Sequence, residues 1–175
     1  MPAPSGPTFV VTARPEGEGR FTTLIEVPGG SILADEPVAA GGGGAGPTPY
    51  QLLSAALAAC TSMTIRLYAA RRLPGLPPFR VEVEHALIPG NPPRDRFTRS
   101  ILVDGALSAE DRARLLDIAG KCPVHRTLSG GGAEIVTGLE APAPSPPPTL
   151  APADPPAAHV EQMAQACEDC GDVGF

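Results

Sequence analysis

The segment TPYQLLSAALAACTSMTIRLYAARR, residues 48–72, constrains the fold more than any other part of the sequence. Thr48 is suited to be a helix N-cap with Gln51 completing a capping box, and Pro49 takes the first helical position, where its missing N–H does no harm. No Gly or further Pro follows before two arginines close the segment. We therefore predict one helix over residues 49–72, about 35 Å long, as a central and largely buried element.

Alternating apolar residues predict β-strands on both sides of this helix. Before it, residues 8–27 form a predicted hairpin around the turn PEGEG, followed by a turn, a short strand in SILADEPVAA and a glycine-rich loop. After it, residues 79–88 and 99–103 are predicted to pair, and AEIVTGL, residues 133–139, supplies a last strand. The expected fold class is α+β.

Two more helices are expected late in the core. Ser108 caps a helix in SAEDRARLLDIAGKC that should end near Gly120, with an inner face made of three apolar residues. These are Leu115, Leu116 and Ile118. Pro123 then starts a short helix with Cys122 at its N-cap.

Length and composition predict one domain followed by a tail. The domain is assigned to residues 1–139, a Pro/Ala-rich linker to 140–158, and an acidic tail with a Cys167-x-x-Cys170 pair to 159–175. The last 36 residues hold six acidic residues and no Lys or Arg, while the remaining 139 hold 13 acidic and 13 basic residues. A neutral core with an acidic tail offers phosphates no basic stripe, which argues against a nucleic-acid binder.

The chain is expected to be cytoplasmic. Its N-terminus lacks the basic flank and apolar stretch of a signal peptide, and we expect no apolar run long enough for a membrane span. Cytosolic cysteines are normally reduced, so the four cysteines are read as reactive thiols, metal ligands or buried residues rather than a disulfide framework.

Cys60 and Cys122 are the candidates for chemistry. Cys60 lies in the long helix, beside an apolar stripe expected from Leu53, Leu57 and Met63, and inert packing in the core remains an open alternative. Cys122 starts a helix between Lys121 and the His125-Arg126 pair, an electropositive setting that lowers a thiol pKa.

The stretch GPTPYQLLSAALAACTSM followed by KCPVHRTL resembles the OsmC/Ohr superfamily over residues 9–139. This resemblance implies two long central helices wrapped by antiparallel sheets, in an intertwined homodimer with active sites at the subunit interface. It implies that Cys60 is the peroxidatic thiol, oxidised to a sulfenic acid, and that Cys122 resolves it as a disulfide. It also implies an activating cation, for which Arg20 is the counterpart in this sequence.

One family position differs. Where better-known members carry a Glu after the helix-opening Pro, this chain has Tyr50, so Asp35 or Glu36 would have to hold the Arg. Tyr50, Leu57 and Met63 are the predicted substrate-binding residues.

The predicted function is reduction of small organic hydroperoxides, with an external dithiol as reductant and no metal or organic cofactor. The alternatives are a non-catalytic redox sensor or a small-ligand binding protein on the same dimeric fold. For Cys167 and Cys170 two hypotheses stay open: a tail without a dedicated role, or a tethered dithiol that reduces the core pair.

Overall fold

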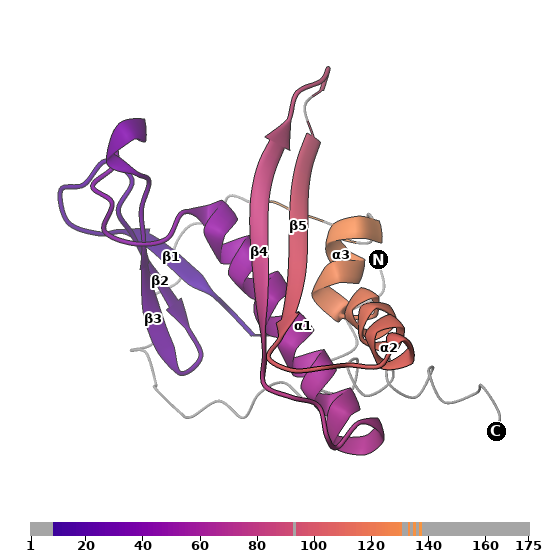
Figure 1. Cartoon of the computed structure of the whole chain (residues 1–175). Coiled ribbons are helices and arrows are strands. Elements are labelled where there is room, and N and C mark those ends of the chain that lie inside the picture. The colour runs from indigo at the N-terminus through magenta and orange to yellow at the C-terminus, as the bar shows by residue number, and fades with distance from the viewer. Residues whose placement is uncertain (1–8, 93, 131–132, 134, 136, 138–175) are drawn as a thin grey trace. The chain divides into compact units, whose positions relative to one another are not determined.

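The computed structural model describes residues 9–92, 94–130, 133, 135 and 137, and divides into two compact units (Figure 1). The first contains the described residues up to Thr48 together with 133, 135 and 137, and the second contains Pro49 to Gly130.

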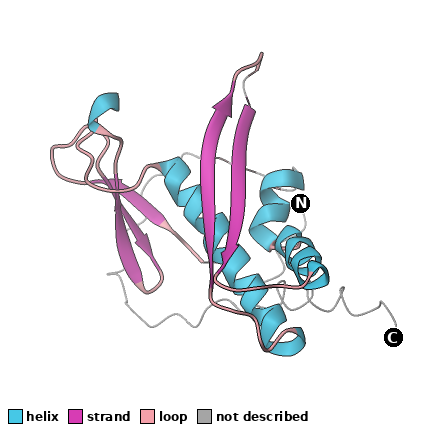
Figure 2. Cartoon of the chain, viewed as in Figure 1, coloured by secondary structure: helices cyan, strands magenta, loops and turns pink. Residues whose placement is uncertain are grey.

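The first unit is a three-stranded antiparallel sheet in the order β1-β2-β3 (Figure 2). Its strands are β1 (Thr12–Pro15), β2 (Thr23–Val27) and β3 (Gly30–Ala34), and a short 3-10 helix, η1 (Val38–Ala40), follows. Each strand pairs with the next strand along the chain. Thr12 of β1 lies opposite Glu26 of β2, and Thr23 of β2 lies opposite Ala34 of β3. The predicted hairpin and the short strand after it are confirmed.

Asp35 organises the glycine-rich loop of this unit. Its side chain, 2 % exposed, accepts hydrogen bonds from the Thr22 hydroxyl and from the backbone N–H groups of Glu36, Gly43 and Ala45. Burial raises the pKa of Asp35, but these hydrogen bonds outweigh it and leave the pKa below its ordinary value. A carboxylate used in this way holds the loop against the sheet.

The second unit contains the long helix α1 (Pro49–Arg72), the hairpin β4 (Phe79–Ile88) and β5 (Arg94–Val103), and the helices α2 (Ala109–Gly120) and α3 (Pro123–Gly130). The two strands are antiparallel, with Phe79 opposite Val103 and His85 opposite Phe97. Helix α1 packs against β4, α2 and α3, and Figure 1 shows the hairpin lying across it.

The predicted bounds of α1, the start of α3 and the pairing of the two strands are confirmed. Strand β5 is longer than expected, since it begins at Arg94 rather than Arg99. The expectation of two long helices is corrected: α1 has 24 residues and α2 only 12. The predicted strand over residues 133–139 falls largely outside the described residues, as do the linker and the tail.

The buried face of α1 differs from the predicted stripe. Leu57, Cys60, Thr61, Thr64, Ile65, Tyr68 and Ala69 are buried. Leu53 and Met63, which were expected on this face, are 41 % and 50 % exposed. On α2, Leu115 and Ile118 are buried as predicted, but Leu116 is 63 % exposed and points away from the core. Helical spacing identifies candidate faces, and packing decides which of them is covered.

The expectation that no apolar run is long enough for a membrane span needs correction. Within the described part of the chain, α1 is long and apolar enough to cross a bilayer by length and composition. A core helix of a soluble protein meets the same criterion, and α1 carries the buried face of the second unit's core, so the finding is weak support for a membrane span.

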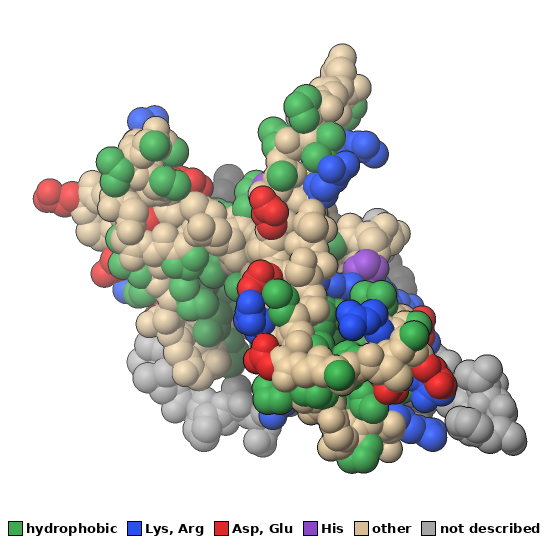
Figure 3. Space-filling model, in the orientation of Figure 1, with side chains coloured by type: hydrophobic (Ala, Val, Ile, Leu, Met, Phe, Trp, Pro, Cys, Tyr) green, Lys and Arg blue, Asp and Glu red, His purple; other side chains and the backbone are tan. Residues whose placement is uncertain are grey.

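The surface of the second unit mixes charges of both signs. In Figure 3 its basic side chains lie among acidic and apolar ones. On α2, Arg114 pairs with Glu110 and Lys121 with Asp117, each four residues apart. Such pairs belong to a solvated helix face and make small contributions to stability.

Ser108 is the confirmed N-cap of α2, because its hydroxyl oxygen accepts a hydrogen bond of 3.0 Å from the Asp111 N–H. Ser108→Ala removes this acceptor and should lower the free energy of unfolding by about 1 kcal/mol, measured by urea denaturation. Ser108→Asp retains a capping oxygen and serves as the control. Equal losses in both variants would contradict the capping role.

Candidate functional site

Cys60 and Cys122 come together in the core of the second unit. Their Sγ atoms, 62 positions apart in sequence, lie 2.7 Å from each other, and both thiols are free. This separation exceeds the roughly 2.05 Å of a disulfide bond, so the sulfurs are in direct contact without being covalently joined. The predicted meeting of the two thiols is present in the structure.

Two helices position the sulfurs. Cys60 lies in the middle of α1, on its buried face, and Cys122 immediately precedes α3, which begins at Pro123. The Arg126 N–H donates to the Cys122 carbonyl, which closes the first turn of α3 with Cys122 at its start. Because α3 packs on α1, the start of the short helix faces the middle of the long one.

The surroundings of the thiol pair are mostly apolar. Leu57 completes a buried cluster with the two cysteines, and Val83, Phe97 and Val124 pack around it. Cys122 is fully buried, whereas Cys60 retains 3 % exposure. Both cysteines are therefore buried within the described part of the chain.

The pair favours one thiolate, on Cys122. The hydrogen bond with Cys60 lowers the pKa of Cys122 from its ordinary value of 9.0 to about 6. Burial opposes this effect, while the N–H groups of His125 and Val124 and the Thr61 hydroxyl add to it. The same contact with Cys122, reinforced by burial, raises the pKa of Cys60. One proton thus remains between two sulfurs, and we place it on Cys60.

Arg99 supplies a cation beside this pair. It lies on the inner side of β5, opposite Val83, and its Nη1 donates to Thr61 Oγ1 and to the Ala119 carbonyl, each at 2.9 Å. Burial lowers the pKa of Arg99, while the charges of Cys122 and Cys60 act in the opposite direction. The sequence analysis did not assign Arg99 to the site. The alternating pattern of the strand could have indicated that the Arg99 side chain points inward. It could not have indicated which groups the side chain contacts.

A second polar group lies on the same hairpin. His85 Nε2 is 2.8 Å from Asp95 Oδ1, and the His85 ring stacks on Tyr50 at a centroid distance of 4.2 Å. The His85 ring also tilts against Phe97, with centroids 4.8 Å apart. Since Phe97 packs against the thiol cluster, this aromatic group borders the site.

The remaining predicted site residues are placed as follows. Tyr50 is 46 % exposed and contacts His85, Leu57 lies in the thiol cluster, and Met63 is half exposed on α1. Arg20 belongs to the first unit, where its guanidinium lies 5.0 Å from the centroid of the Phe21 ring. Cys167 and Cys170 lie outside the described residues.

The predicted substitutes for the family Glu were Asp35 and Glu36. Asp35 uses both carboxylate oxygens to hold the loop of the first unit. In the described ranges, no ion pair joins Arg20 to Asp35 or to Glu36.

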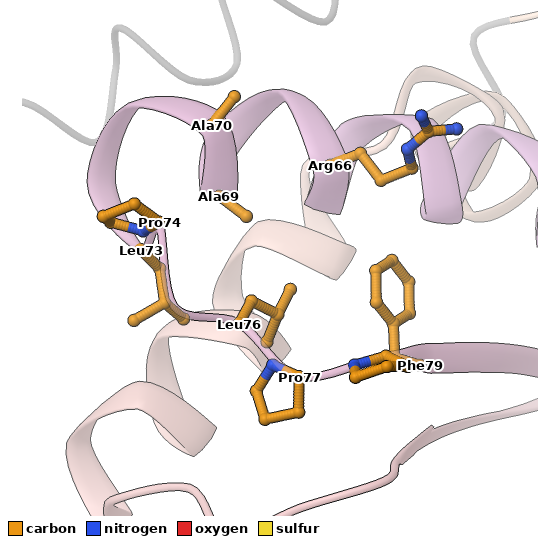
Figure 4. Close-up of a pocket in the computed structure, with 9 residues that line it drawn as sticks. Arg66, Ala69, Ala70, Leu73, Pro74, Leu76, Pro77 and Phe79 are labelled. Atoms are coloured by element: carbon orange, nitrogen blue, oxygen red, sulfur yellow. The ribbon is translucent and has the colours of Figure 1, made fainter.

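A shallow groove of about 660 Å³ lies at the C-terminal end of α1 (Figure 4). The turn between α1 and β4 forms one side of it, and Arg66, Ala69 and Ala70 of α1 form the other. No cysteine lines this groove, so it is separate from the thiol pair.

The arrangement can carry out two-electron thiol chemistry. A thiolate and a thiol in contact can be oxidised to a disulfide, since a sulfenic acid formed on one sulfur condenses with the other. Among the described residues, no cluster of three or more His, Cys, Asp or Glu could hold a metal ion.

Comparison with known proteins agrees with this geometry. A family model described as OsmC-like protein matches residues 41–137, which is more than half of the chain. A search of curated proteins found no match.

Solved structures share the fold at low identity. An OsmC like protein from Mycoplasma pneumoniae is 21 % identical with a TM-score of 0.57, over 71 % of this chain and 89 % of that one. An organic hydroperoxide resistance protein OsmC from Legionella pneumophila is 22 % identical with a TM-score of 0.55, over 70 % and 90 %. The organic hydroperoxide resistance protein OhrB of Bacillus subtilis is 21 % identical with a TM-score of 0.53, over 70 % and 92 %. With its two cysteine motifs inside the matched region and its fold shared with these proteins, the chain belongs to the OsmC-like family of the OsmC/Ohr superfamily.

Proposed function

We propose that this protein is a thiol peroxidase that reduces small organic hydroperoxides through Cys60 and Cys122. The observation that carries the proposal is the buried contact of 2.7 Å between the two sulfurs. Two of the structural relatives are named for organic hydroperoxide resistance, which supports this class of substrate. No metal or organic cofactor is required for this chemistry.

The first step oxidises Cys60. The proton between the sulfurs moves to Cys122, which leaves Cys60 as the thiolate. That thiolate attacks the O–O bond of the hydroperoxide, so an S–O bond forms and the O–O bond breaks. The leaving alkoxide takes a proton from solvent, giving an alcohol and a sulfenic acid on Cys60. Cys60 is assigned the attack because membership of the family implies that the cysteine in the long helix is the peroxidatic thiol.

The second step forms the disulfide. The Cys122 sulfur attacks the sulfenic acid of Cys60, an S–S bond forms, and the hydroxyl leaves as water. An external dithiol then returns both sulfurs to thiols and becomes a disulfide itself. We place this cycle in the cytoplasm, where dithiol reductants are available.

We further propose that the chain acts as a homodimer, as its superfamily implies. Leu53 and Met63 on α1 are exposed and apolar, so a second copy that covered them would remove apolar surface from water.

Removing the attacking sulfur should abolish turnover. In Cys60→Ser, consumption of cumene hydroperoxide should fall to that of buffer alone. In Cys122→Ser, one round of oxidation should stop at a sulfenic acid that a carbon nucleophile can trap. Mass spectrometry should find a Cys60–Cys122 bridge in the parent protein and in neither of these two single variants. The Cys167→Ser/Cys170→Ser double variant should still form that bridge.

Other outcomes have definite meanings. Turnover by Cys60→Ser with oxidation of Cys122 would reverse the roles of the sulfurs. A slow bridge without turnover in the parent protein would favour the redox sensor over the enzyme.

The reaction should lose rate in acid. Because the pKa of Cys122 lies at about 6, one thiolate per pair is present above that pH and is protonated as the pH falls through it. The first-turnover rate should therefore rise with a midpoint near pH 6 and stay level toward pH 8. Stopped-flow measurement of peroxide loss checks this, and a midpoint near the ordinary value of 9.0 would contradict it.

A charge on the exposed side of α1 should disrupt the dimer. Met63→Glu is expected to shift the mass in solution, measured by light scattering, from two chains toward one. Arg72→Glu, at the exposed end of the same helix, is the control for the added negative charge. A parent protein that is monomeric at micromolar concentration would refute this part of the proposal.

A further inference from the structure

Arg99 is a partly buried cation with an unusual set of partners. Its guanidinium donates to a hydroxyl and to a backbone carbonyl. Within the part of the chain that the structure describes, no carboxylate forms an ion pair with it. Attraction to the cysteine pair, to Cys122 first, opposes the effect of burial on the pKa of Arg99. A guanidinium remains protonated in proteins, so its charge needs an anion nearby.

The hydrogen bonds of Arg99 reach the neighbour of Cys60 on one side and a hydrogen-bond partner of Cys122 on the other. Thr61 is fully buried on α1, next to Cys60 in sequence, and accepts from Arg99 while its own hydroxyl donates to the Leu57 carbonyl. Ala119 lies in the last turn of α2, and the Cys122 N–H donates to the same carbonyl that Arg99 binds, at 3.4 Å. The guanidinium therefore ties the end of α2 and the residue before α3 to the centre of α1.

The other titratable groups around the pair are engaged elsewhere or lie outside the cluster. On the hairpin, His85 is bound to Asp95. Between α2 and α3, Lys121 is paired with Asp117, 3.1 Å away. On α3, His125 contributes its backbone N–H to Cys122, and Arg126 is exposed. On α1, Arg66 is exposed.

We propose that Arg99 is the positioning residue that keeps the Cys60–Cys122 pair singly ionised, by holding a partly buried positive charge between Thr61 and the Ala119 carbonyl, to which the Cys122 N–H also donates. This deepens the proposed peroxidase function and assigns the activating cation to β5. The thiolate would depend on Arg99 even in a protein that only senses oxidants.

The test measures the pKa of the pair without any peroxide. In the full chain carrying Cys167→Ser and Cys170→Ser, only the core thiols titrate, followed by thiolate absorbance in the ultraviolet and by the pH dependence of alkylation. Arg99→Gln removes the charge but keeps an amide that can donate a hydrogen bond. It should raise the thiol pKa by roughly 1–3 pH units. Arg99→Lys restores a cation and should bring the thiol pKa most of the way back to the parent value.

Two controls separate charge from structure. Arg96→Gln removes an exposed cation three positions away on the same strand and should leave the thiol pKa unchanged. Thr61→Val, in which Arg99 is intact, should raise the pKa by a smaller amount. Circular dichroism and urea denaturation establish that each variant is folded.

The possible outcomes distinguish the two proposals. An Arg99→Gln protein that is folded and titrates like its parent overturns the role of Arg99, as does an equal effect of Arg96→Gln. If Arg99→Gln does not fold, the thiol pKa values of Arg99→Lys and Thr61→Val are compared with that of the parent. The proposal is refuted if Thr61→Val leaves the pKa unchanged while Arg99→Lys raises it. A parent protein that consumes no hydroperoxide refutes the peroxidase while leaving this pKa relation intact.

Discussion

The contact between the Cys60 and Cys122 sulfurs is the interaction on which the candidate site depends. Two thiols in an apolar cluster share one hydrogen bond, and the charge that this contact favours must be held in a place where water is scarce. The polar groups around the pair stabilise this charge. The start of α3 directs N–H groups at Cys122, Thr61 lends a hydroxyl, and Arg99 brings a positive charge.

This arrangement divides two tasks between the sulfurs. Cys122 gathers the groups that favour an anion, whereas Cys60 keeps the proton. The proposed attack then needs an uphill proton transfer from Cys60 to Cys122, because Cys60 has the higher pKa of the two, and it needs no separate base. The contact that tunes the pair also places the resolving sulfur next to the attacking one, so the same geometry serves both proposed steps.

Much of the fold followed from local rules. The bounds of α1, the Ser108 cap and the start of α3 at Pro123 were predicted because caps and proline act within a few residues. The side of each helix that is buried was harder to predict. Met63 and Leu116 have apolar neighbours at helical spacing and are nevertheless exposed, because the partner elements cover a different face. The candidate site was predicted through its two cysteines, while Arg99 and the pair of His85 with Asp95 were missed.

The sequence by itself determined where the helices begin, that Cys60 lies inside one helix and Cys122 at the start of another, and which family the chain resembles. These depend on side chains that are close along the chain. The tertiary structure decided that the two sulfurs touch, that Asp35 binds a loop and that Arg99 of β5 contacts the neighbour of Cys60 on α1. The physical reason is that burial, charge partners and pKa values depend on segments far apart in sequence, which only packing brings within a few ångströms.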